Sequence, residues 1–162
     1  IMVTASTTKI ERVKALGAHL AIDYRQQDFA AEVNAFTQDR GADLILDHIG
    51  GAYLAKNQAA LAVGGRLVAI GLMGGATAEI NLGLLLVKRQ RIIGSVLRAL
   101  PVPEKTAITN AFVDRVLPHF RRRTLLPLIH RVYPLAEVAA AHEEMEASRH
   151  FGKIVLSVAA AS

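Results

Sequence analysis

The sequence predicts an α/β fold built on a doubly wound parallel sheet. Short apolar runs alternate with amphipathic helical segments, and glycine follows most of the apolar runs. This alternation is typical of parallel strands joined by right-handed helical crossovers. The run from 42 to 47 is almost continuously apolar, as expected for a strand covered by helices on both faces. Ligands of such sheets bind beyond the carboxyl ends of the strands, so a site is expected there.

The first part of the chain supplies the regular part of this pattern. Strands are predicted at 1–5, 20–24, 42–47 and 66–70, with helices at about 8–16, 28–37 and 53–62. Thr8 and Glu11 have the spacing of a capping box for the first helix, and Gly17 is placed to end it.

The rhythm changes after Gly75. The sequence predicts a short helix at 82–89, a strand at 91–97, a long helix at 104–121, an extended segment at 125–132, a helix at 135–146 and a final strand at 153–158. Neither an internal repeat nor a low-complexity linker interrupts this order.

Composition excludes several classes of protein. The chain has 162 residues, of which 52 % are apolar and 20 % charged, so it can form a core and is not globally disordered. No apolar run approaches the roughly 20 residues that span a bilayer. The absence of cysteine excludes disulfides and thiolate zinc sites, and it fits the cytoplasmic location that we expect. The net charge of +5 comes with few aromatic residues, which disfavours a nucleic-acid surface that stacks bases.

The turn after the first strand is the first candidate site. Residues 4–9 combine hydroxyl groups, the start of a helix and Lys9, and no carboxylate comes before Glu11. These groups could bind an anion such as the 2′-phosphate of NADP. The alternative is an ordinary helix start with a solvated lysine, and the turn alone leaves both interpretations open.

Two other strand ends carry candidate groups. Glycines at 71–75 would let the backbone approach a ligand closely, or would only allow a tight turn. Asp47 could act as a base or bind a ribose, and His48 could shuttle a proton. A structural or solvated role is the alternative for both residues.

The sequence contains no motif typical of a metal site or of a catalytic serine. The six histidines never come at a ligand spacing with carboxylates, and Ser6, Ser95 and Ser148 lack the glycine context of a nucleophile elbow. The run Arg121–Arg123 is interpreted as a solvated helix end that complements the helix dipole, with a nucleic-acid patch as the alternative.

Eight short motifs together resemble a known family over 1–158. They are Thr4–Ser6 with Lys9, Leu16–Ala18, Asp23–Arg25, Gly41–Asp43, Leu46–Gly51, Gly65–Arg66, Gly71–Gly75 and Gly152–Leu156. Their order and spacing resemble the C-terminal half of quinone oxidoreductases in the medium-chain dehydrogenase/reductase superfamily, with the p53-inducible branch nearest.

The resemblance implies a zinc-free Rossmann domain that binds NADPH and passes a hydride to quinones or to other activated carbonyl or enone acceptors. It assigns the adenosine 2′-phosphate to Ser6, Lys9 and Tyr24 and places Ile49 near the adenosine or ribose. The residues that it assigns to the nicotinamide end are Gly71, Leu72, Met73, Leu97 and Arg98. It names no catalytic side chain.

The sequence also departs from this family. The glycine-rich phosphate turn and the GroES-like catalytic domain, which precede the matching part in the family, are not in the sequence, so we expect a fragment with little reductase activity alone. The strand corresponding to the family's first would be central in the order 3-2-1-4-5-6, and its loss should leave two edges unpaired.

The family comparison also gives the domain division and a partner surface. Residues 1–124 would form the partial NADP-binding domain, and residues 125–162 a segment that returns to the catalytic domain. A homodimer through the edge strand Arg91–Leu97 is expected, and neither nucleic acid nor a membrane is expected as a partner. The alternative function is a non-catalytic nucleotide-binding or dimerisation module.

Overall fold

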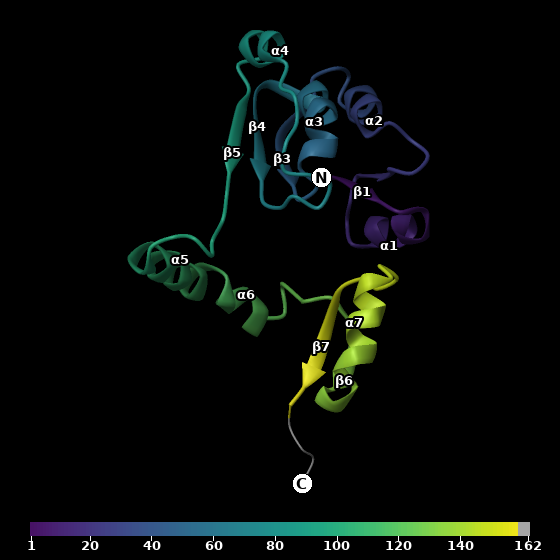
Figure 1. The fold of residues 1–162 in the computed structure, drawn as a ribbon, viewed down its shortest axis with the longest axis vertical. Coiled ribbons are helices and arrows are strands. Elements are labelled where there is room, and N and C mark those ends of the chain that lie inside the picture. The colour runs from purple at the N-terminus through teal and green to yellow at the C-terminus, as the bar shows by residue number, and fades with distance from the viewer. Residues whose placement is uncertain (159–162) are drawn as a thin grey trace. The chain divides into compact units, whose positions relative to one another are not determined.

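Parallel strand pairs form every sheet in residues 1–158, which are the residues that the computed structural model describes. The chain divides into two compact units, Ile1–Ala99 and the part from Leu100 onward (Figure 1). The α/β class and the parallel pairing expected from the sequence are confirmed. The division expected after residue 124 concerns membership of family domains and stays a prediction.

The first sheet pairs β1 (Met2–Ala5) with β2 (Leu20–Asp23). They are joined by the 3₁₀ turn η1 (Thr7–Lys9) and the helix α1 (Ile10–Ala15), and Gly17 has the expected positive φ of 99° after α1. The predicted capping box is wrong. Thr8 lies inside η1, Lys9 is the residue before α1, and neither Ser6 nor Lys9 caps with its side chain. The segment begins with a 3₁₀ turn, so Thr8 does not stand at the position before the first residue of the helix, where it could cap it.

The second sheet has the order β3 (Ala42–Asp47), β4 (Leu61–Ala69) and β5 (Arg91–Gly94). Its connections include η2 (Gly51–Tyr53), α3 (Leu54–Ala60) and α4 (Leu82–Val87). β4 begins at Leu61 rather than at the predicted residue 66, because the shift of register between Ala42 and Leu44 lets the strand continue through the glycine pair at 64–65. β5 is exposed along its whole length and lies at an edge of this sheet, as predicted.

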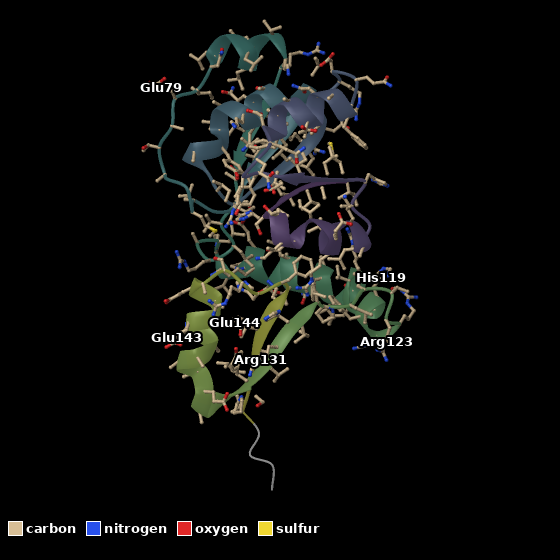
Figure 2. The ribbon with its side chains drawn as sticks, turned by 90° about the vertical axis from the view of Figure 1, so that its right-hand side faces the viewer. Glu79, His119, Arg123, Arg131, Glu143 and Glu144 are labelled. Atoms are coloured by element: carbon tan, nitrogen blue, oxygen red, sulfur yellow. The ribbon has the colours of Figure 1, made fainter. Side chains whose placement is uncertain are left out.

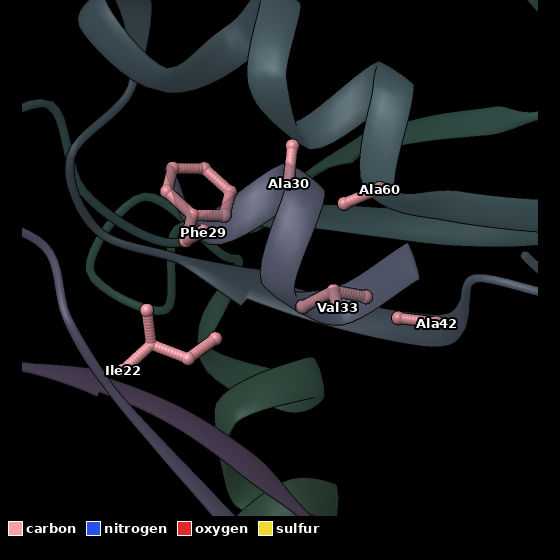
Figure 3. Packing of buried hydrophobic residues seen from close by; sticks show 6 residues of the cluster. All are labelled: Ile22, Phe29, Ala30, Val33, Ala42 and Ala60. Carbon is pink, nitrogen blue, oxygen red and sulfur yellow. The ribbon is translucent and has the colours of Figure 1, made fainter. Parts of the chain in front are cut away.

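One apolar cluster connects the two sheets through α2 (Phe29–Phe36) and α3. Figure 3 shows its six residues, Ile22 from β2, Ala42 from β3, Ala60 from α3, and Phe29, Ala30 and Val33 from α2. The ring of Phe29 lies 4.9 Å from that of Tyr53, between centroids. Asp28 starts α2 by accepting hydrogen bonds from the backbone amides of Ala30 and Ala31.

The two sheets of the first unit are separate. Among the described strands, β1 pairs only with β2, and β3 pairs only with β4. Both β1 and β3 therefore keep one unpaired edge, and these are the two edges that the loss of a central strand was expected to leave.

The second unit contains α5 (Val102–Arg115), α6 (Leu117–Arg121), β6 (Ile129–Pro134), η3 (Leu135–Glu137), α7 (Val138–Glu146) and β7 (Lys153–Ser157). The single helix predicted at 104–121 is interrupted at Val116, because Pro118 in the first turn of α6 has no N–H to continue the helix. β6 pairs with β7 in parallel. None of the helices in residues 1–158 is long and apolar enough to cross a membrane.

Candidate functional site

A buried carboxylate organises the end of the first sheet. Asp23 is 7 % exposed and lies at the carboxyl end of β2, in register with Ala5 at the end of β1. Its Oδ2 accepts from Thr7 Oγ1 at 2.5 Å and from Gln26 Nε2 at 2.9 Å, and its Oδ1 accepts from the backbone N of Arg25 at 3.0 Å. These bonds, led by that from Thr7, lower the pKa of Asp23. The carboxylate thus fixes η1 against the turn after β2.

Three of the expected cofactor residues meet at this place. The backbone N of Tyr24 donates to the carbonyl of Ala5 at 3.2 Å, so Tyr24 lies beside the start of the turn at Ser6, the residue after β1. The amide of Lys9 donates to the carbonyl of Ser6 at 2.8 Å, which closes the turn. The guanidinium of Arg25 lies 6.0 Å from the centroid of the Tyr24 ring. Ser6, Lys9 and Tyr24 are therefore gathered at one strand end, with Arg25 as a second cation.

The donor set at this end fits a phosphate group. Hydroxyl groups and cations surround the turn, and both oxygens of Asp23 already accept hydrogen bonds from the protein. Asp23 is buried and holds the two turns together, and the end of β1 itself carries hydroxyl groups and Lys9 with no carboxylate before Glu11. The nature of these groups agrees with a 2′-phosphate.

The second sheet ends in two loops that are joined by their backbones. The amide of Met73 donates to the backbone carbonyl of His48 at 3.1 Å, and the amide of Gly74 donates to that of Ile49 at 2.6 Å. In the opposite direction, the amides of Gly51 and Ala52 donate to the carbonyls of Gly75 and Gly74. A Cβ on Gly74 would lie 2.7 Å from Cγ2 of Ile49. The glycine cluster is explained by this close packing of loops, which supports the tight-turn interpretation.

Asp47 has a structural role in the same loops. It is 5 % exposed, and its two oxygens accept from the backbone amides of Ile49 at 2.8 Å and Gly50 at 3.0 Å. These bonds shape the turn after β3. His48 next to it is exposed.

The remaining expected residues follow β5. Ser95 donates its amide to the carbonyl of Ala69 at 3.0 Å, which keeps the segment after β5 beside the end of β4. Leu97, which is exposed, and Arg98 continue from there. Ile49, Gly71–Met73 and this pair thus all follow strands of the second sheet, whereas Ser6, Lys9 and Tyr24 follow strands of the first. The two groups therefore lie at the ends of different sheets.

Sequence reasoning missed Asp23 as the centre of the first group. Asp23 belongs to the motif Asp23–Arg25, in which the resemblance assigns a role only to Tyr24. The partner of Asp23 is Thr7, 16 residues away, and only the pairing of β1 with β2 brings them together. The sequence did contain a signal for this contact. A residue with a hydroxyl group follows the first predicted strand, and a carboxylate stands near the end of the next one.

Titratable groups of β6 and α7 lie together in the second unit, and Figure 2 labels two of these residues, Arg131 and Glu144. One oxygen of Glu144 lies 2.8 Å from Nε2 of His130, and the other accepts from the hydroxyl of Tyr133. The bonds from Tyr133 and His130 lower the pKa of Glu144. Arg131 lies over the Tyr133 ring, 4.5 Å from its centroid. These contacts attach α7 to β6. Residues 1–158 contain no group of three or more His, Asp or Glu side chains that could hold a metal ion.

Comparison with known proteins assigns the chain to a family of enzymes with the same kind of parallel sheet. The family described as zinc-binding dehydrogenase matches residues 16–156, which is most of the chain. The chain belongs to the zinc-binding dehydrogenase family. Membership implies a nicotinamide nucleotide cofactor, and the parallel sheets correspond to the Rossmann-like domain that binds it in these enzymes.

Several of the proteins similar to this chain are oxidoreductases. Human quinone oxidoreductase is 28 % identical over 158 residues, and the match covers 96 % of this chain and 46 % of the human protein. A 2-haloacrylate reductase from a Burkholderia species is 30 % identical, with 94 % of this chain and 46 % of that protein covered. The crystal structure of a quinone oxidoreductase from Pseudomonas syringae pv. Tomato DC3000 superposes with a TM-score of 0.80 at 25 % identity and covers 96 % of this chain and 48 % of that one. The chain therefore spans about half the length of these relatives.

Proposed function

We propose that this chain is the cofactor-selecting part of an NADPH-dependent quinone oxidoreductase. The observation that supports this most is the pair of turns held together by Asp23, which bring Ser6, Lys9, Tyr24 and Arg25 to the same end of the first sheet. The acceptors proposed are quinones or other activated carbonyl and enone compounds. The quinone oxidoreductases among the relatives support this choice of acceptor.

The preference for NADPH follows from the charges at that turn. NADPH differs from NADH by a phosphate on the adenosine ribose, and a phosphate is stabilised by lysine, arginine and hydroxyl donors. Ser6, Lys9 and Tyr24 are proposed to bind it. Arg25 adds positive charge beside Tyr24.

The second sheet would hold the other end of the cofactor. We assign Ile49 to the adenosine or ribose, and Gly71–Met73 with Leu97 and Arg98 to the nicotinamide. The cofactor, when bound, supplies the hydride, and the protein positions it and excludes competing reactions. The bonds between the loops at 48–52 and 71–75 give these residues a fixed backbone on which to orient the ring.

The test compares two lysines of the same segment. Lys9→Ala should weaken binding of NADPH about tenfold, the loss of one charged contact to phosphate, and should leave NADH binding nearly unchanged. Lys14→Ala is the matched control, because Lys14 is exposed and pairs with Glu11 at 2.8 Å. Isothermal titration with both cofactors measures the effect. Equal losses for NADPH and NADH with Lys9→Ala, or no loss, would contradict the proposal.

The second candidate is a non-catalytic nucleotide-binding or dimerisation module. The exposed edge strand β5 favours it, together with the exposed Val87 on the preceding helix, since unpaired edges readily pair with another copy. A homodimer through Arg91–Leu97 belongs to this proposal, as does a cytoplasmic location for either function. Light scattering with NADPH titration separates the candidates, because a dimer that binds no cofactor would favour the module. Turnover of NADPH with a simple quinone at a typical enzymatic rate would contradict our expectation that the chain alone has little activity.

A further inference from the structure

His48 is the one histidine in the loops that end the second sheet, residues 47–53, 70–77 and 95–98. It directly follows β3 and its side chain is exposed. The facing loop, residues 70–77, contains no titratable side chain. The ordinary titration of histidine lies near neutral pH, so this side chain is suited to give up and regain a proton.

The backbone of His48 is held against the loop that we assign to the nicotinamide. Its carbonyl oxygen accepts a hydrogen bond from the amide of Met73 at 3.1 Å. A Cβ on Gly71 would lie 2.9 Å from that oxygen and 3.1 Å from both Cα and Cβ of His48. A side chain at position 71 would therefore collide with His48, and glycine permits the close approach. The imidazole consequently leaves the backbone beside Gly71.

The other titratable groups next to His48 in the chain are engaged within the protein. Both oxygens of Asp47 accept hydrogen bonds from backbone amides, at 2.8 Å from Ile49 and at 3.0 Å from Gly50. Burial raises the pKa of Tyr53 in η2, so this phenol keeps its proton at neutral pH. Neither group is suited to exchange a proton with a ligand in place of His48.

Charges from the neighbouring elements leave the same conclusion. A cavity of about 730 Å³ between β1 and β3 borders on His48, and its β1 wall, Met2–Thr4, is uncharged. Farther along the cavity, Arg40 and Asp43 pair with each other at 2.7 Å. Arg98 follows β5 and stays protonated throughout the ordinary pH range, as arginine does in proteins. The protonation of His48 is thus the charge at this end that changes near neutral pH.

We propose that His48 supplies the proton of the reduction and that its protonation depends on the redox state of the cofactor, an inference that rests on the proposed function. When bound, the cofactor supplies a hydride and is left with one positive charge on its nicotinamide ring. The hydride brings one hydrogen and two electrons to the acceptor, whose oxygen then carries a negative charge. His48 gives a ring proton to that oxygen and takes another from water, because its side chain is exposed.

The dependence on redox state follows from the charges. A protonated imidazole and an oxidised nicotinamide ring are both positive, so each disfavours the other, whereas the reduced ring is neutral. Binding and protonation are linked reciprocally, so a lower pH should favour NADPH over NADP⁺. Both forms carry the 2′-phosphate, and the titration of that group therefore cancels in the ratio of their affinities.

The test measures the dissociation constants of NADPH and NADP⁺ by isothermal titration of the 162-residue chain at pH 8.5 and pH 6.0. The preference for NADPH should rise at least about threefold as the pH falls. His48→Gln should remove this rise, because glutamine carries no ionisable proton. His19→Gln is the matched control, since His19 is exposed and precedes β2, and it should keep the rise.

A second readout needs no substitution. Ring-proton NMR of the parent chain should show His48 titrating at a lower pH with NADP⁺ than with NADPH. Identical titration curves with the two cofactors, a ratio of affinities that does not change with pH, or a rise that survives His48→Gln would each overturn the inference. NADPH binding by the parent would in those cases leave the proposed function standing, whereas a parent that binds no NADPH would overturn both.

Discussion

The ends of the two sheets in the first unit are built in opposite ways. At the end of β1 and β2, a buried side chain organises the turn, since Asp23 binds Thr7, Gln26 and the amide of Arg25. At the end of β3 and β4, the loops hold each other through backbone amides and carbonyls, and glycine makes the close approach possible. The first end carries hydroxyl groups and cations, whereas the second supplies a fixed backbone. Selectivity should therefore reside at the first end, and rigidity at the second.

The largest effect is expected from a glycine of the second end. Gly50 has a φ of 81°, and a Cβ there would lie 2.7 Å from the carbonyl oxygen of Gly75. Gly50→Ala should lower the free energy of unfolding by about 3 kcal/mol, because backbone strain adds to a clash that no side chain can relieve. Gly64→Ala is the matched control, since Gly64 has a φ of 76° but open space around its Cβ position. It should cost about 1 kcal/mol. Equal midpoints in urea for the two variants would show that the loop contact is unimportant.

The next effect concerns the carboxylate of the first end. Asp23→Asn keeps the shape but removes the charge that accepts from Thr7 and Gln26, so the turn with Ser6 and Lys9 loosens. NADPH binding should weaken about tenfold, with a smaller change for NADH. Fluorescence titration with both cofactors measures this. A variant that binds NADPH as tightly as the parent would mean that Asp23 does not position the site.

A smaller effect should appear as a dependence of stability on pH. The pKa of Asp23 is lower in the folded chain than its ordinary value of 3.8. Its contribution to stability is therefore present above that ordinary value and is lost as the pH falls through the lowered one. Urea unfolding between pH 5 and pH 3 should show a steeper loss of stability for the parent than for Asp23→Asn. Parallel curves would contradict this assignment.

The smallest effect should come from the edge strand. Ile93 lies on the exposed strand β5, so Ile93→Glu should leave the fold and NADPH binding unchanged within error. If β5 joins two copies, the charge should also convert a dimer to a monomer in light scattering. A dimer that survives the substitution would exclude this strand as the contact.

The sequence predicted the order of the elements because their periodicity and glycines are local signals. The prediction from sequence failed at the ends of elements that are set by a contact with a distant strand or by a break within a helix. The helix expected through residue 121 breaks at Val116, and β4 extends back to Leu61 because its neighbour β3 shifts register. In the site, Lys9 and Tyr24 could be named from a resemblance, but the role of Asp23 depends on a partner 16 residues away.

The separation of the sheets was also foreseeable, since it follows from strand order alone. The cavity that results was not, because its lining combines β1, β3 and the face of α2. Such a space depends on how helices pack, and no local pattern in the sequence encodes it.

The central claim, that residues after β1 and β2 select the 2′-phosphate, is tested most directly with two small nucleotides. Adenosine 2′,5′-bisphosphate and adenosine 5′-monophosphate differ only in that phosphate. Titration followed by amide NMR shifts should show the bisphosphate binding at least about tenfold more tightly, with shifts at Ser6, Lys9 and Tyr24. Equal affinities, or shifts confined to the loops of the second sheet, would contradict the account.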